Sequence, residues 1–247
     1  MNNQKIYAVM SGKGGVGKST ISCFLASILC KHGKTLIIDF DICGPSIADC
    51  IQIKGKVKNV KGGFLPIKYN DNLDVLSFGS ILNQDDVVIW RGPKKLVFLE
   101  KLLAAAFLRN DQNELLYDYV VIDTPPGISD EHRFLIDRKL EVFIVTTSQN
   151  IALNDTQNSI EFCMDNKIEI KGVFQNMSFI TCECCNEKTH IYGKNGGKLL
   201  SEEYEIPFLG ELELINKIDK SNDHLFNLFD KTESFQNVEN KISDSII

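Results

Sequence analysis

The apolar residues of this chain fall into short continuous runs that are separated by longer segments with helical spacing. The runs have the length of buried strands and lie at residues 6–10, 35–39, 117–123, 142–147 and 170–174. Helical patterns lie between them, at residues 21–32, 94–109 and 152–164. Continuous apolar strands that alternate with helices are typical of a parallel sheet covered on both faces. The pattern predicts an α/β fold, a mostly parallel sheet flanked by helices, in a single domain over residues 1–247.

The remaining segments predict smaller elements. Residues 54–78 are interrupted by Gly and Pro, which favours a hairpin followed by a strand at 73–77. Further elements are a short helix at 198–204, a last strand within 206–214 and an amphipathic helical tail over about 223–247. Acidic side chains outnumber lysines in the tail, so we expect it to pack on the domain rather than on an anionic membrane.

The segment at 94–109 has a recognisable helical pattern of its own. Leu96, Leu99, Leu103 and Phe107 recur near helical spacing and predict its buried face. A proline, Pro93, stands just before the segment and suits a first helical turn. For the tryptophan upstream of it, Trp90, we expect a packing role.

A phosphate-binding pattern, SGKGGVGKST, joins the first strand to the first helix over residues 11–20. Its glycines allow backbone N–H groups to approach phosphate oxygens, and the helix N-terminus adds a positive dipole. In such a loop the lysine at the position of Lys18 reaches the β and γ phosphates, and the hydroxyl at the position of Ser19 ligates magnesium. The string therefore predicts a nucleoside triphosphate site.

Carboxylates follow two of the predicted strands. Asp39 and Asp41 stand at the end of one strand, and Asp123 ends another. Ligands of a parallel sheet bind beyond the carboxyl ends of its strands, so these side chains are expected near the phosphate loop. Asp123 can anchor the magnesium shell. Asp39 or Asp41 can bind or orient that shell or the attacking water, whereas turn capping by both is the alternative.

Two polar features follow the strand at 170–174. The amide of Asn176 matches the N6 and N7 edge of adenine, although an asparagine that caps a turn explains it equally well. Cys182 and Cys185 form a CxxC pair with Cys184 between them. In a chain with eight cysteines this spacing is weak evidence for a metal site by itself, and the other five cysteines stand among apolar neighbours, as core residues do.

Composition and charge restrict the function classes. The 247 residues have a formal net charge of -6, which argues against nonspecific electrostatic binding to nucleic acid or to anionic lipid. The apolar runs are far too short to span a bilayer, and the first ten residues lack the pattern of a signal peptide. We expect a soluble, cytoplasmic protein without a nucleic-acid or membrane partner.

The string GKGGVGKST carries a second lysine, Lys13, and resembles the deviant-Walker ATPases. These include the Mrp and ApbC iron-sulfur carriers, the MinD and ParA positioning ATPases and the nitrogenase iron protein. The DTPPG string that begins at Asp123, residues 176–179 and the CxxC pair resemble the Mrp group in the same order. In that family the early lysine reaches the nucleotide of the partner subunit, so the resemblance implies an ATP-dependent dimer.

The resemblance also implies a function and a set of residues. It implies an ATP-hydrolysing carrier or scaffold that holds a 4Fe-4S cluster between two subunits and transfers it to apoproteins, with ATP and Mg²⁺ as cofactors. Since no cysteine precedes Cys23, the chain matches the shorter eukaryotic branch, whose partner is a second copy or a longer paralogue. The implied residues are Lys13, Lys18 and Asp41 for catalysis; Gly12, Lys13, Gly14, Gly15, Val16, Gly17, Lys18, Ser19, Thr20, Asp39, Asp123 and Asn176 for the nucleotide; Ser19 and Asp123 for magnesium; and Cys182 and Cys185, within residues 176–197, for the cluster.

Two other classes share the phosphate loop. A positioning ATPase explains Lys13 but leaves the CxxC pair unused, unless that pair is half of a structural zinc site that bridges a dimer. An electron-donating reductase like the nitrogenase iron protein carries its cluster cysteines beside the strand that ends in Asp123, where this chain has none.

Overall fold

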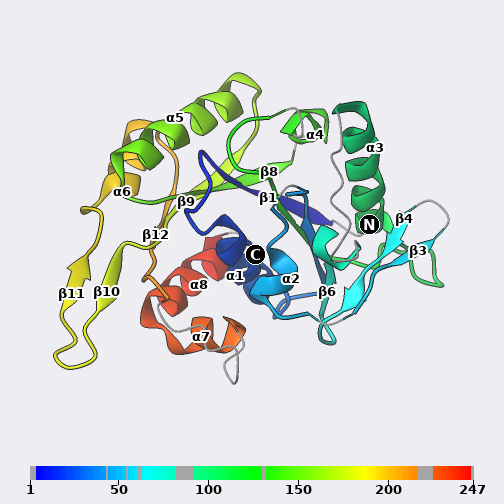
Figure 1. Ribbon diagram of the computed structural model, residues 1–247, viewed down its shortest axis with the longest axis horizontal. Coiled ribbons are helices and arrows are strands. Elements are labelled where there is room, and N and C mark those ends of the chain that lie inside the picture. Colours follow the sequence, from blue (N-terminus) through cyan, green and yellow to red (C-terminus); the bar gives the residue numbers. More distant parts are fainter. Residues whose placement is uncertain are drawn as a thin grey trace.

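An eight-stranded sheet forms the centre of the computed structural model, which describes residues 4–42, 44–53, 55–60, 63–81, 92–129, 132–138, 140–215 and 225–245 (Figure 1). The strand order is β12-β9-β8-β1-β7-β2-β6-β5, and only β5 runs antiparallel to its neighbour. The strands are β1 (Lys5–Ser11), β2 (Thr35–Asp39), β5 (Ile67–Lys68), β6 (Leu73–Leu76), β7 (Tyr119–Asp123), β8 (Glu141–Thr146), β9 (Ile170–Gln175) and β12 (Phe208–Glu211). The predicted α/β fold with a mostly parallel sheet is confirmed.

Helices cover both faces of this sheet (Figure 1). One face packs against α1 (Lys18–Leu29), α2 (Ile47–Cys50), α7 (Leu225–Lys231) and α8 (Glu233–Ser245). The other packs against α3 (Gly92–Leu103), α4 (Arg133–Arg138), α5 (Asn150–Asp165) and α6 (Gly196–Glu203), with short 3₁₀ turns at Phe78–Ser80 and Ala104–Phe107. None of the described helices is long and apolar enough to cross a bilayer.

The continuous apolar runs of the sequence are explained by this double cover. On β1, Tyr7 and Val9 point into the core beneath α1, whereas Ala8 and Met10 point into the core beneath α3 and α5. All four side chains are fully buried. Because successive residues of a strand face opposite sides, a strand covered on both faces must be apolar at every position.

Two antiparallel hairpins lie outside the main sheet. The first, β3 (Lys58–Val60) with β4 (Gly63–Leu65), is the hairpin expected within residues 54–78. The second, β10 (Phe179–Thr181) with β11 (Lys188–His190), was not predicted, and its tip extends away from the sheet (Figure 1). The three-residue strands of this second hairpin are too short to give a period-two signal in the sequence.

The helix at 94–109 differs from its prediction in length and in face. It begins at Gly92, which places Pro93 in the first turn as expected, and ends at Leu103. Leu99 and Leu103 are buried, but Leu96 and Phe107 are exposed by 38% and 44%. Phe98 and Leu102 are buried beside Leu99 and Leu103, and Phe107 lies beyond the helix in the following 3₁₀ turn. Trp90 lies outside the described residues.

The C-terminal tail forms two helices rather than one, and it packs on the domain as predicted. The chain turns at Thr232, and this turn brings both Phe229 and Phe235 against Phe24 of α1, with ring centroids 5.1 and 4.8 Å from that of Phe24. A single straight helix could not place both rings on one residue. Lys31 at the end of α1 pairs with Glu239 of α8 at 2.7 Å.

We predict that Phe235→Ala lowers the free energy of unfolding by about 3 kcal/mol or more, because it leaves a cavity beside Phe24 at a fully buried site. Urea unfolding followed by circular dichroism measures the loss. The matched control is Phe107→Ala, since that ring is 44% exposed. Equal losses in the two variants would show that the tail does not contribute to the core.

Candidate nucleotide site and cysteine hairpin

The phosphate loop, residues 11–17, lies between β1 and the first turn of α1, and its backbone needs glycine. Gly15 and Gly17 have φ angles of 81° and 83°, which L side chains rarely adopt. A Cβ on Gly12 would lie 2.2 Å from the backbone carbonyl carbon of Asp155 in α5. The loop can therefore pass close to α5 and turn its N–H groups inward only with these glycines.

An ion pair joins the loop to the end of β7. The Lys18 ammonium donates to Asp123 Oδ1 at 2.7 Å, and both side chains are almost completely buried. The same carboxylate accepts hydrogen bonds from the Ser19 hydroxyl at 2.6 Å and from the Ser22 hydroxyl at 2.7 Å. The two residues predicted to hold magnesium, Ser19 and Asp123, are thus in direct contact, and they form an oxygen donor set of the kind that Mg²⁺ prefers.

Asp39 lies level with Asp123 in the sheet register but has a different set of partners. It is fully buried and accepts hydrogen bonds from the amides of Ser46 and Ile47 and from the Ser77 hydroxyl at 2.9 Å. Burial and the neighbouring Asp123 raise its pKa to about 7. This carboxylate holds the start of α2 in place, and it does not line the cavity described next.

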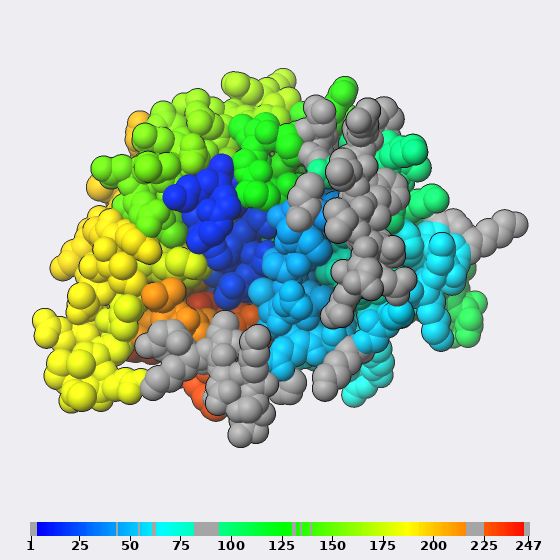
Figure 2. Space-filling model, in the orientation of Figure 1, coloured from blue at the N-terminus to red at the C-terminus, as the bar shows by residue number. Residues whose placement is uncertain are grey.

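A cavity of about 300 Å³ opens above the loop, where the strands end. Figure 2 shows the loop segment (dark blue) at the surface, bordered by the lighter blue segment after β2 and the green segment after β7. Asp41 lines the cavity and accepts a hydrogen bond from the Gly44 amide at 3.0 Å. Other predicted residues on its wall are Lys13, Gly14, Gly15, Gly17, Lys18, Ser19 and Thr20. Sequence reasoning missed Ser11, Gly44, Ser46, Cys50 and Pro126.

Lys13 and Asn176 both make contacts within their own chain. The Lys13 ammonium donates to Gln149 Oε1 at 3.1 Å, and Lys13 lines the cavity. The Asn176 amide donates to the Val16 carbonyl at 2.9 Å, so this buried side chain ties the end of β9 to the phosphate loop. Neither Gln149 nor this role of Asn176 has a signal in the local sequence.

The three clustered cysteines form the tip of the β10–β11 hairpin. The turn is closed by hydrogen bonds from the Cys182 amide to Glu187 and from the Asn186 amide to Cys182. All three thiols are exposed, and the backbone N–H groups of Cys184 and Cys185 lower the pKa of Cys182. A lowered pKa favours the thiolate, which is the form that binds metal. Among the described residues, no three His, Cys, Asp or Glu side chains converge to hold a metal ion.

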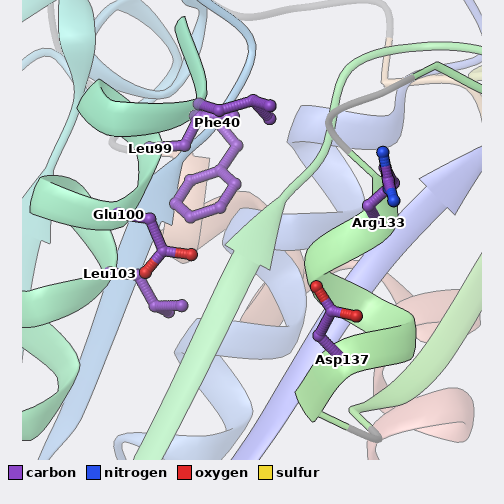
Figure 3. Close-up of a pocket in the computed structure, with 7 residues that line it drawn as sticks. Phe40, Leu99, Glu100, Leu103, Arg133 and Asp137 are labelled. Atoms are coloured by element: carbon purple, nitrogen blue, oxygen red, sulfur yellow. The ribbon is translucent and has the colours of Figure 1, made fainter. Parts of the chain in front are cut away.

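A second cavity, of about 200 Å³, lies between α3 and α4 (Figure 3). Phe40, Leu99 and Leu103 give it an apolar side, and Arg133 and Asp137 face it from α4. None of the predicted site residues lines it, and it contains no glycine-rich backbone. The first cavity is therefore the candidate nucleotide site. His132 is fully buried and lines neither cavity.

The fold and the phosphate loop define the class: the chain is a P-loop NTPase. A model of the NUBPL iron-transfer P-loop NTPase family matches residues 2–247, so the chain belongs to this family. It is 40% identical over 221 residues to the cytosolic Fe-S cluster assembly factor Nubp2 homolog 2 of Drosophila yakuba, covering 85% of this chain and 83% of that one. The corresponding factor of Nematostella vectensis is 37% identical over 219 residues, covering 85% and 79%.

Solved structures agree on the fold. A nucleotide-binding protein from Archaeoglobus fulgidus in complex with ADP is 28% identical, with a TM-score of 0.65 over 96% of this chain and 88% of that one. The septum site-determining protein MinD of Pyrococcus horikoshii, complexed with Mg-ADP, has a TM-score of 0.63 over 97% and 96% at 17% identity, a likeness that concerns the fold alone.

We predict that Lys18→Ala abolishes ATP binding, because Lys18 supplies a buried ammonium on the cavity wall, and that it leaves Asp123 buried without this cation. The free energy of unfolding should fall by about 3 kcal/mol while the fold persists. Isothermal titration with Mg-ATP and urea unfolding measure the two effects. Lys31→Ala, just beyond the end of α1, is the control and should bind Mg-ATP normally. ATP affinity retained in Lys18→Ala contradicts the assignment.

Proposed function

We propose that this chain is an ATP-hydrolysing carrier that binds a 4Fe-4S cluster between two subunits and transfers it to apoproteins. One observation carries the proposal: the same chain holds a phosphate-loop cavity and an exposed CxxC pair at the tip of a hairpin. The names of its relatives, cytosolic Fe-S cluster assembly factors, support both the cluster as cargo and a cytosolic location.

The nucleotide site is proposed to promote ATP hydrolysis by positioning the phosphates and stabilising their negative charge. The loop amides and Lys18 would receive the phosphates, and Ser19 with Asp123 would hold Mg²⁺, which would neutralise phosphate charge. Lys18 must then turn from Asp123 towards the γ-phosphate, an exchange of one anionic partner for another. Asp41, on the cavity wall, is placed to orient the attacking water. This assignment makes the chain an ATPase.

The cluster end requires a second subunit. A four-iron cluster is normally held by four thiolates. Cys182 and Cys185 of one chain supply two, and a two-fold axis brings the same pair from the partner to the same point. A cluster held in this way is exposed at a seam between two chains and can be passed on. The partner is a second copy or a longer paralogue, and the recipients are apo iron-sulfur proteins.

Asn176 offers a physical connection between the two ends. Its amide contacts the phosphate loop at the Val16 carbonyl, and only three residues later Phe179 begins β10 of the cysteine hairpin. Beyond Asn176, the Ser178 amide is held by the Leu212 carbonyl next to β12. A shift of the loop on nucleotide binding would therefore move the base of the hairpin. We propose that nucleotide turnover is coupled to cluster binding through this contact.

The cysteine assignment predicts unequal effects of three substitutions. Cys182→Ala and Cys185→Ala should each remove the cluster, whereas Cys184→Ala should largely spare it, since two CxxC pairs already complete the four thiolates. The measurement is the iron and sulfide content, with the optical spectrum, of anaerobically reconstituted protein. Equal loss in all three variants, or zinc in place of iron in protein purified anaerobically, would overturn the assignment.

A second prediction concerns Lys13. If this lysine leaves Gln149 and reaches the nucleotide of the partner subunit, Lys13→Ala should lower ATP turnover by about a hundredfold while Mg-ATP affinity changes little. Steady-state hydrolysis and isothermal titration on the same preparation separate these quantities. Lys171→Ala, whose ammonium pairs with Glu169 on the surface, serves as the control. Wild-type turnover in Lys13→Ala would exclude a role in trans.

A further inference from the structure

Two thiols that no part of the proposed function uses meet beside the nucleotide cavity. Cys23 lies on α1, five residues after Lys18, and is fully buried. Cys50 is the last residue of α2, is half-buried and lines the cavity. The two side chains lie within interaction range of one another, although 27 positions separate them in the sequence. Cys23 shares a core cluster with Ile47 and Ile51, and Cys50 packs against that cluster.

We infer that Cys23 and Cys50 are a redox modification site: a peroxide that enters through the nucleotide cavity joins them in a disulfide and thereby weakens Mg-ATP binding. This inference goes beyond the carrier function and concerns the same cavity. The two thiols differ in the way the reaction requires. Cys50 is reachable from the cavity, whereas Cys23 is enclosed by the core and can react only with its neighbour.

The pKa directions fit these separate roles. The contact between the two thiols lowers the pKa of Cys50 and raises the pKa of Cys23 well above its usual value, with burial of Cys23 acting in the same direction. Cys50 is therefore the more acidic thiol of the pair. The nucleophile in oxidation is the thiolate.

The reaction balances with a peroxide as the two-electron oxidant. The Cys50 thiolate attacks one peroxide oxygen, the O–O bond breaks, and Cys50 becomes a sulfenic acid as hydroxide or alkoxide leaves. Cys23 then attacks the Cys50 sulfur: the S–S bond forms, the S–O bond breaks, and the oxygen leaves as water with the Cys23 proton. A dithiol reductant reverses the sequence.

The other described cysteines are placed differently. Cys163 is buried against the Met10 sulfur at 3.9 Å, and burial raises its pKa to about 12. Cys30 is on α1 as its C-terminal cap, and its thiol donates to the Ser27 carbonyl at 3.2 Å. Neither lines the cavity. The exposed hairpin thiols, Cys182 to Cys185, lie on a separate element.

A bond between α1 and α2 acts on the magnesium position. The Ser46 hydroxyl, just before α2, donates to the Ser19 hydroxyl at 2.6 Å. Mg²⁺ ligation requires the Ser19 oxygen to change its partners, so the hydrogen bond from Ser46 to Ser19 must break. A disulfide from Cys50 to α1 holds α2 against this change. By linkage, bound Mg-ATP should in turn lower the equilibrium constant for disulfide formation by the same factor.

The test uses the full chain with Cys182→Ala, Cys184→Ala and Cys185→Ala, so that the hairpin thiols do not consume oxidant. After treatment with hydrogen peroxide and alkylation, mass spectrometry of tryptic peptides should show residues 19–31 joined to residues 35–54. Each peptide holds a second cysteine, Cys30 and Cys43, so fragmentation must place the link at Cys23 and Cys50. The inference is wrong if Cys23 of the oxidised protein can still be alkylated after unfolding, or if Cys50 is linked to a different cysteine.

The functional arm is isothermal titration with Mg-ATP before and after oxidation. We expect affinity to fall about fivefold on oxidation and to recover with dithiothreitol. Cys30→Ser should behave in the same way, whereas Cys23→Ser should lose the response. If Cys23→Ser does not fold, Cys50→Ser is used instead. Only its failure to form the cross-link is then scored, because Cys50 itself lines the nucleotide cavity. If the fully cross-linked protein binds Mg-ATP as tightly as the reduced protein, the disulfide does not weaken nucleotide binding. If the reduced protein does not bind ATP at all, the proposed carrier function is wrong, but the mapped disulfide is unaffected.

Discussion

The buried ion pair between Lys18 and Asp123 is the contact on which the rest of the site depends. Two charges without water are stable only with close geometry and further hydrogen bonds, and Ser19 and Ser22 supply those bonds to the same carboxylate. Asp123 ends β7 beside β1, so the parallel register carries the carboxylate directly to the phosphate loop. The pair thereby fixes the first turn of α1 against the centre of the sheet.

The surrounding structure follows from this arrangement. The Phe24 ring on α1 receives two aromatic rings of the tail, so the C-terminal helices stabilise the helix that begins at the loop. On the other side of the loop, Asn176 connects Val16 to the segment that leads into the cysteine hairpin. The phosphate loop and the exposed thiols are therefore linked by one short stretch of backbone, and the proposed coupling between nucleotide and cargo rests on this stretch.

The parts of this picture that could be predicted are those with a local pattern. Continuous apolar strands gave the sheet, and a contiguous loop motif gave most of the cavity wall, including Lys18 and Ser19. Contacts between residues far apart in the sequence, such as that of Gln149 with Lys13, could not be predicted, because no local sequence pattern marks either residue as the partner of the other. Asp39 resembled a cavity residue because it ends a strand, yet its hydrogen bonds to α2 place it beneath the wall.

The measurement that tests the central claim most directly is native mass spectrometry of the wild-type protein, reconstituted anaerobically with iron and sulfide. The account predicts a species of two chains and one 4Fe-4S cluster, because one chain offers only two cysteines in the required spacing at its hairpin tip. A single chain that carries an intact cluster, or a pair of chains that carries two, would contradict a site shared between subunits.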